Sequence, residues 1–189
     1  MEISFSYIIT FISLIYGLAL AHSLSCIAEY IQHWNKIKHY WVWWFWAIFL
    51  ILLSVGFWIS IYALYSKTDN WIVSHFFFLT LQSALFYLTY YIFFNHYDDL
   101  ENSNLQLEYY KYKRVFFILL SIQFILMFFG HNLLATDKSI TTILMQNFPI
   151  LIYSICLVAL AFINNKIVHK VFAIFFLFMF IAVIALDSI

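Results

Sequence analysis

The chain has 189 residues, of which 66% are apolar, 10% are charged and 23% are aromatic. Soluble domains are about half apolar and about a quarter charged, so this composition excludes a soluble globular protein and predicts an integral membrane protein. Equal numbers of basic and acidic residues exclude a basic nucleic-acid binder, and 3 Gly, 1 Pro and 2 Cys exclude a glycine-rich phosphate loop and a disulfide framework.

Apolar runs in the sequence predict the helices. A helix needs about 20 apolar residues to cross the hydrocarbon layer of a bilayer. Six runs of that kind, separated by polar residues, predict an all-α polytopic membrane protein: one transmembrane domain over residues 1–189, folded as a bundle of six helices. The helices are expected at about residues 5–30, 41–65, 71–94, 115–130, 140–163 and 171–186, with a cytoplasmic loop at 95–114.

The basic residues predict the orientation of the chain. Seven of them fall between helices on one side of the membrane: Lys36, Lys38, Lys111, Lys113, Arg114, Lys166 and Lys170. Only Lys67 and Lys138 fall on the other side. Because short loops rich in Lys and Arg stay cytoplasmic, both termini are expected outside. The start Met1–Ser4 carries no basic residue, so the first apolar run is expected to be a retained helix and not a signal peptide.

The loop at 95–114 is acidic first and basic later, with apolar and tyrosine residues between the charges. Its charged residues are Asp98, Asp99, Glu101, Lys111, Lys113 and Arg114. Two interpretations are open. The stretch is an interfacial helix start whose lysines reach the headgroups, or these residues form a docking surface for a cytoplasmic protein partner.

The first helix carries two neighbouring stripes. Small residues recur every four positions, at Ser13, Gly17, Ala21 and Ser25, a spacing typical of close helix packing. Beside them, His22, Cys26 and Glu29 share one face, and Cys156 of the fifth helix is expected at a similar depth. A metal centre of these four is the weaker hypothesis, because zinc sites usually contain closely spaced ligand pairs. No metal is predicted.

Amide side chains in the middle of the membrane are the second candidate group. They are Gln82, Gln123, Gln146 and Asn147, and Pro149 lies just beyond the last of them. Proline cannot donate a backbone hydrogen bond, so a carbonyl one turn earlier is freed at membrane depth. The amides and the proline either line a pathway or serve only to hold helices together.

The histidines raise the hypothesis of a haem site, because two of them on different helices could bind a haem iron as axial ligands. His75 and His131, both at the outer interface, are the better pair. Most of the other histidines also fall at an interface, where the residue is an ordinary polar boundary group. No cofactor is therefore predicted.

Residues 5–64 resemble small multi-pass bacterial membrane proteins of unassigned function. The likeness rests on a Gly-Leu-small-His segment in the first helix and on an aromatic second helix after a basic turn. The residues that carry it are Gly17, Leu18, Ala21, His22, Tyr40, Trp41 and Trp46. The resemblance implies a bacterial inner-membrane setting and no activity.

The preferred functional hypothesis is a homo-oligomer in the lipid bilayer that passes ions or a small solute. The amides and Pro149 would line the route, and His22 with Glu29 would form a titratable gate. The alternative is a sensor or anchoring subunit that signals to a soluble partner through the loop at 95–114. A haem- or metal-binding protein ranks below both. No enzyme is predicted, because the chain lacks paired intramembrane Asp residues and a His-Glu-x-x-His helix.

Overall fold

The computed structural model describes residues 5–65, 73–94, 103–133 and 140–187 of the chain. Every named element in these ranges is helical, and a single isolated β-bridge joins two of the connections. The elements are α1 Phe5–Gln32, the 3-10 turn η1 Trp34–Lys36, α2 Trp41–Tyr65, α3 Val73–Phe93, α4 Leu105–Leu133, α5 Ile140–Phe162 and α6 Lys166–Asp187. The prediction of an all-α protein is confirmed.

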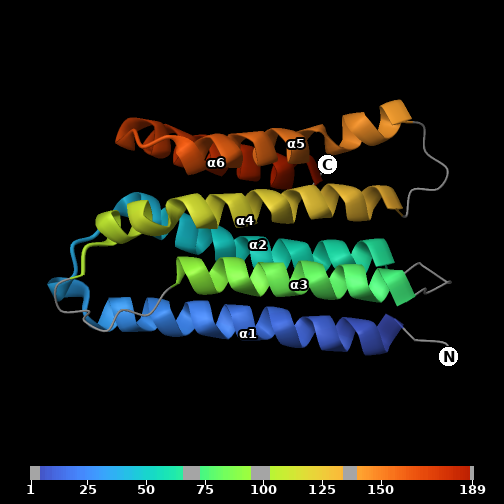
Figure 1. Cartoon of the computed structure of the whole chain (residues 1–189), viewed down its shortest axis with the longest axis horizontal. Coiled ribbons are helices and arrows are strands. Elements are labelled where there is room, and N and C mark those ends of the chain that lie inside the picture. The colour runs from blue at the N-terminus through green and yellow to red at the C-terminus, as the bar shows by residue number, and fades with distance from the viewer. Residues whose placement is uncertain (1–4, 66–72, 95–102, 134–139, 188–189) are drawn as a thin grey trace.

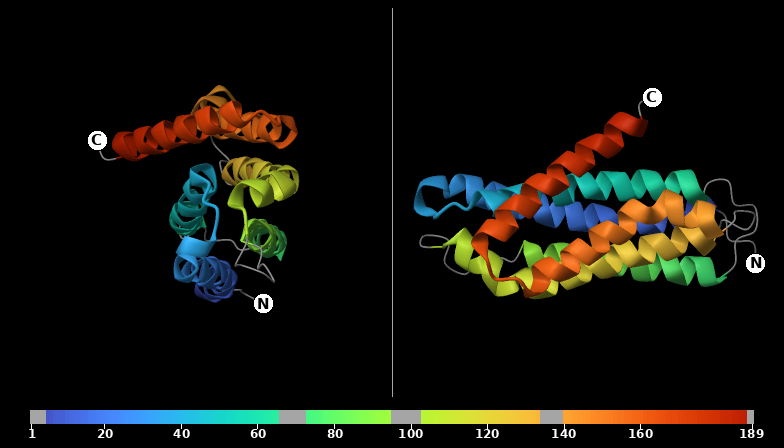
Figure 2. Two further views of the ribbon diagram at one scale, coloured as in Figure 1. Left: turned by 90° about the vertical axis from the view of Figure 1, so that its left-hand side faces the viewer. Right: turned by 90° about the horizontal axis from the view of Figure 1, so that it is seen from above.

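The helices run antiparallel in chain order, so the α1–α2, α3–α4 and α5–α6 connections meet at one end, on the left of Figure 1. Helices α1, α2, α4 and α3 contact one another in a closed ring. α5 packs along α4, and α6 contacts α2. Figure 2 shows α6 crossing the bundle obliquely, with its C-terminal half diverging from the other helices.

Four helical segments of the described chain are long and apolar enough to cross a membrane. They are Ser6–Gln32, Trp41–Tyr62, Val73–Phe93 and Leu105–Gly130. α5 adds the shorter apolar segment Phe148–Phe162. Helices of this length and apolarity fit the multi-pass membrane character that the composition predicts.

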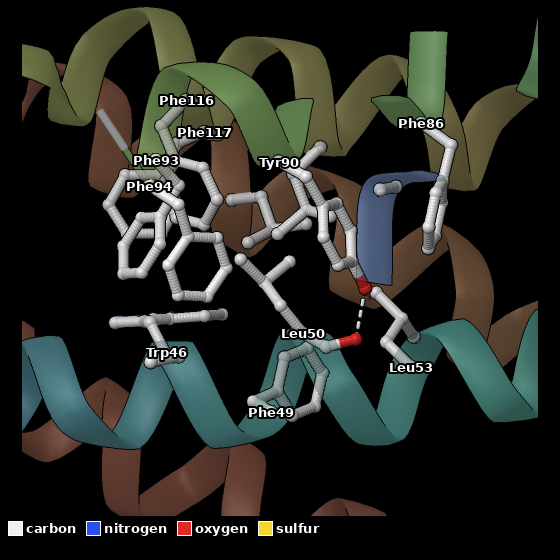
Figure 3. Close-up of a cluster of buried hydrophobic side chains, with 14 of the residues drawn as sticks. Trp46, Phe49, Leu50, Leu53, Phe86, Tyr90, Phe93, Phe94, Phe116 and Phe117 are labelled. Carbon is white, nitrogen blue, oxygen red and sulfur yellow. Dashed lines mark hydrogen bonds between the residues drawn. The ribbon is translucent and has the colours of Figure 1, made fainter. Parts of the chain in front are cut away.

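Aromatic rings fill the centre of the bundle. The Trp46 ring of α2 lies 5.1 Å from Phe117 of α4 and 5.3 Å from Phe176 of α6, measured between centroids. Phe93 of α3 lies 4.6 Å from Phe116 of α4. Figure 3 shows labelled rings of α2, α3 and α4 meeting in this cluster. Large aromatic rings in contact bury much area, so these contacts hold the helices together.

Two hydroxyl groups join helices inside the apolar core. The Tyr90 hydroxyl of α3 donates a hydrogen bond to the Leu50 carbonyl of α2, as Figure 3 shows. The Ser121 hydroxyl of α4 donates to the Ser154 carbonyl of α5 at 3.1 Å. Each hydroxyl reaches a carbonyl of a neighbouring helix, which satisfies a polar group that would be costly to bury alone.

The start of α4 differs most from the predicted elements. The helix begins at Leu105, ten residues before the expected boundary at 115, so the second half of the predicted loop 95–114 is helical. Asn104 caps it, because its side-chain oxygen accepts hydrogen bonds from the backbone N–H groups of Gln106 at 3.0 Å and Leu107 at 3.4 Å. Residues 105–114 include many polar residues, so apolar runs in the sequence do not mark this part of the helix.

α6 also begins earlier than expected, at Lys166 and not at 171. The Asn165 side-chain oxygen accepts a hydrogen bond from the Ile167 N–H at 2.9 Å and so caps its first turn. The other predicted helix ends lie within three residues of those observed, which is the usual uncertainty of such boundaries.

Candidate functional site

The end of the molecule that holds the α1–α2, α3–α4 and α5–α6 connections is called the basic end here. It carries the seven basic residues that the sequence places on one side of the membrane. In Figure 1 it is the left-hand end of the bundle. Three sets of hydrogen bonds join its connections, and they are described in turn.

The first set joins the α1–α2 linker to the start of α4. The Lys38 N–H donates to the Ser103 carbonyl at 3.0 Å, and the Leu105 N–H donates to the Lys38 carbonyl at 3.1 Å. Ile37 and Tyr40, on either side of Lys38, are buried. A linker and a helix start that are far apart in sequence are thereby held side by side.

Lys113 makes the second set. Its side chain is 5% exposed, and its ammonium group donates to three carbonyls at the end of α5: Leu160 at 3.4 Å, Ala161 at 3.0 Å and Ile163 at 2.7 Å. The last carbonyls of a helix have no donor within the helix, and a cation is favourable there. Lys113 therefore caps α5. The prediction that it lies on an exposed docking surface is wrong, because its side chain is buried.

His169 makes the third set. Its side chain is 0% exposed, its Nε2 lies 2.8 Å from the Ile163 carbonyl, and its Nδ1 lies 2.7 Å from the Tyr109 hydroxyl. The Nε2–H tautomer satisfies both contacts, because Nε2 then donates to the carbonyl and Nδ1 accepts from the hydroxyl. His169 thus joins α6 to α4 and to the α5–α6 turn.

Burial also changes the acidity of His169, which lies outside the four candidate spans. Removal from water lowers the pKa of this imidazole below its ordinary value of 6.5. The hydrogen bond to the Ile163 carbonyl acts in the opposite direction, and the positive charge of Lys113 lowers the pKa further. The neutral form is therefore the one that suits this site.

Sequence reasoning missed this role of His169, which it treated as a boundary residue. The available signal was the spacing of Leu105, Tyr109 and Lys113, which recur every four residues and are all buried. Such a stripe predicts that α4 begins near residue 105 and not at 115, and that the face of α4 carrying these residues is covered by other helices.

The predicted gate lies near the basic end, between α1 and α3. His22 Nε2 lies 2.9 Å from the Phe94 carbonyl, and the Cys26 thiol donates to the same carbonyl at 3.2 Å. The His22 ring also stacks on Tyr91, with centroids 5.1 Å apart. His22 and Cys26 thus share one face, as predicted, and both contact the end of α3. Glu29 is half-buried on the same helix.

The weaker metal hypothesis required Cys156 beside this face. Cys156 lies on α5, which packs on α4, whereas α1 lies on the opposite side of the ring, as Figure 2 shows. Within the described chain, no group of three or more His, Cys, Asp or Glu side chains could hold a metal ion. For the haem hypothesis, the side chain of His131 lies outside the described residues, so the pair with His75 is not observed.

The predicted pathway residues are only partly described. Gln82 of α3 and Gln123 of α4 are buried. Both polar atoms of the Gln123 side chain lack a hydrogen-bond partner in the described structure. The side chains of Gln146 and Asn147 lie outside the described residues, and Pro149 is inside α5. The predicted grouping of the four amides therefore involves side chains outside the described residues, and it stays a prediction.

The small-residue ridge of α1 is covered at one position. The Ser13 hydroxyl accepts a hydrogen bond from Trp58 Nε1 of α2 at 2.9 Å. Gly17, Ala21 and Ser25 are exposed, and a Cβ atom added at Gly17 would meet nothing within 4 Å. Most of the ridge therefore faces outward from the described chain.

The predicted docking residues divide into three groups. Asp98, Asp99 and Glu101 lie outside the described residues. Lys113 is buried, as shown above. Lys111 and Arg114 are exposed, with the Lys111 ammonium 3.7 Å from Glu108 and the Arg114 guanidinium 5.1 Å from the Phe162 ring centroid.

No protein-family model, curated protein or solved structure matches the chain. The class of protein that the fold defines is an all-α protein with helices able to cross a membrane. At its basic end, the Lys113 and His169 side chains bind carbonyls at the end of α5, and backbone hydrogen bonds at Lys38 join the α1–α2 linker to the start of α4.

Proposed function

We propose that the chain is a membrane-embedded sensor or anchoring subunit that passes a change in the bilayer to a soluble partner at the basic end. One observation carries the proposal: hydrogen bonds at Lys38, Lys113 and His169 fasten the α1–α2 linker and the α5–α6 turn to the first half of α4. A tilt or shift of one spanning helix would move the others through these contacts. The output would be a displacement of the whole basic end.

The aromatic core supports the same proposal. Buried rings fill the space between the helices: Trp46 contacts Phe116 and Phe117, and Phe93 contacts Phe116. Such a core transmits strain between helices, as a sensor requires. A polar route along the bundle would have to displace these rings.

The partner surface in this proposal consists of the exposed residues Lys111 and Arg114 together with the segment at 95–102. That segment carries Asp98, Asp99 and Glu101. Mixed charges at the edge of a membrane suit a soluble protein partner of complementary charge.

The proposal includes the setting of the chain. All six helices would span the bilayer, with the basic end in the cytoplasm of a bacterial cell and both termini outside the inner membrane. The concentration of Lys and Arg at one end supports this orientation. The exposed ridge of Gly17, Ala21 and Ser25 supports a homo-oligomer, since small residues let helices approach closely.

A second candidate function, passage of ions or a small solute, is favoured by Gln123. A buried amide without a partner in the described residues is a site where water could bind. In that case, conductance across planar bilayers should be abolished by Gln123→Leu with assembly unchanged. His22 and Glu29 would then act as the gate.

The sensor proposal is tested by the depth of three positions on the basic end. Cys26→Ser and Cys156→Ala remove the native thiols, and single cysteines at Lys36, Leu107 and Lys170 carry a spin label. The depth of each label is measured by its accessibility to oxygen and to a nickel chelate. Bilayers of short-chain and long-chain phosphatidylcholine supply the disturbance.

We expect all three labels to change depth together when the bilayer is thinned. Lys113→Met combined with Tyr109→Phe removes the hydrogen bonds from α4 to the end of α5 and to His169 of α6, so the label at position 170 should then move independently. Lys111→Met serves as the control. Labels that do not respond, or that respond independently in the unaltered chain, would overturn the sensor proposal. Discrete conductance that Gln123→Leu removes would support the second candidate instead.

A further inference from the structure

Three exposed cations around the turn between α5 and α6 have no acidic partner among the residues that the structure describes. They are Arg114, Lys166 and Lys170. Lys111 differs, because its ammonium lies near Glu108, and Lys113 is buried against carbonyls. Cations that are not used inside the fold are available for an external anion.

These three cations flank the turn between α5 and α6. The Arg114 guanidinium lies over the ring of Phe162, the last residue of α5. Lys166 begins α6, and Lys170 follows one turn later on the same face. Figure 1 shows this turn at the same end as the start of α4, which carries Arg114.

The turn itself is held firmly. Lys113 donates to the Ala161 and Ile163 carbonyls, and His169 contacts the Ile163 carbonyl from the other side. Its backbone is therefore ordered before any ligand arrives. A cation on such a support loses less conformational freedom when it binds.

Apolar side chains lie beside the cations. Phe162 is 56% exposed, Ile167 is 70% exposed and Val171 is 57% exposed. A site that presents both unpaired cations and exposed apolar groups at the end of membrane helices fits an amphiphile. Two lysines one turn apart repel each other, and an anionic group between them relieves that repulsion.

We propose that the α5–α6 turn binds the headgroup of an anionic phospholipid, with Arg114, Lys166 and Lys170 contacting the phosphate and Phe162 and Ile167 contacting the acyl chains. A lipid is favoured over a soluble anion because the apolar groups would otherwise be left in the interface without a partner. Basic residues next to membrane helices are attracted to anionic lipids. The site does not depend on whether the chain acts as a sensor or as a channel.

The test uses the purified full chain in a neutral detergent. Its melting temperature is measured as dioctanoyl phosphatidylglycerol, dioctanoyl phosphatidylcholine or inorganic phosphate is added. A ligand that binds the folded state raises the melting temperature with concentration, which yields an apparent Kd. We expect the anionic lipid to stabilise the protein well beyond the other two probes.

The variant Lys166→Gln with Lys170→Gln should weaken binding of the anionic lipid by about fivefold for each lysine, since one basic residue near the surface contributes about 1 kcal/mol. The matched control is Lys36→Gln with Lys111→Gln, which removes the same charge from residues engaged in interactions of their own. This control should retain the binding. Lys170→Gln alone should give half of the effect on a logarithmic scale, and it checks against misfolding of the double variant.

Three results would overturn the proposal. An equal response to the neutral lipid would mean that only the acyl chains bind. An equal response to inorganic phosphate would mean that the site takes a soluble anion. An equal loss in the control variant would mean that total charge, and not this turn, attracts the lipid.

Discussion

Polar side chains at the basic end and in the aromatic middle of the bundle find different partners. At the basic end, Lys113, His169, His22 and Cys26 each contact a backbone carbonyl at the end of a helix. In the middle, the Tyr90 and Ser121 hydroxyls each reach a carbonyl within a neighbouring helix. The larger amide of Gln123 is buried there and has no partner in the described structure.

The difference follows from where a helix leaves its carbonyls free. The last four carbonyls of a helix lack an internal donor, so a polar side chain nearby stabilises them and is itself satisfied. Carbonyls in the middle of a helix already accept a hydrogen bond from the N–H four residues later, and a side chain reaches their second lone pair only at close helix contacts, as at Leu50 and Ser154. The amide of Gln123 finds no such carbonyl among the described residues, and aromatic neighbours cannot supply an acceptor.

The largest expected effect is at Lys113. Lys113→Met removes the ammonium that caps α5, and hydrogen bonds to charged groups contribute about 1.5–3 kcal/mol. We expect the free energy of unfolding in detergent, measured by denaturant titration, to fall by about 2 kcal/mol. Lys111→Met is the control, since an exposed ion pair contributes at most about 1 kcal/mol. Equal losses in the two variants would contradict the capping role.

The middle of the bundle should respond in the opposite direction. Gln123→Leu replaces an unpartnered amide with an apolar group of similar size, so the free energy of unfolding should rise by about 1 kcal/mol. Ser121→Ala on the same helix removes a hydroxyl that donates to Ser154, and there the free energy should fall. A loss of stability in Gln123→Leu would mean that the amide binds water or another group.

The smallest expected effect is a pH dependence at His169. Its folded pKa is below the ordinary value of 6.5, because burial disfavours the charged form. The unfolded chain therefore binds the proton more readily, so the contribution of His169 to stability is complete above pH 6.5 and declines as pH falls towards the folded value.

Melting temperatures between pH 5 and pH 8 test this prediction. His169→Gln should show a weaker decline on acidification than the unaltered chain, whatever its stability at neutral pH. His39→Gln is the control, since His39 is exposed and its removal should leave the decline in place. An identical decline in the unaltered chain and in His169→Gln would contradict the prediction.

Sequence patterns were sufficient for most helix positions but not for the start of α4. Long apolar runs mark a helix by composition alone, whereas the turn from Leu105 to Arg114 is amphipathic and carries three basic residues. Its buried stripe of Leu105, Tyr109 and Lys113 is visible in the sequence only if Lys113 is allowed to be buried. Lysine is rarely buried without a partner, and that partner, the end of α5, lies far away in the chain.

For the candidate site too, the sequence predicted what lies within one helix but not what depends on contacts between helices. The shared face of His22 and Cys26 follows from helical spacing within one element. The contact that both make with Phe94 depends on how α1 packs against α3, and no local pattern encodes it. The same holds for the separation of Cys156 from α1.

The sequence by itself determined the class of the protein, because composition decides which solvent a surface can face. It also determined where the long apolar helices lie and which end carries the positive charge. Only the tertiary structure decided which polar residues serve structure and which are free. Lys113 and Lys170 look alike in the sequence, yet one caps α5 and the other is exposed, because the free carbonyls of a helix end lie beside only one of them.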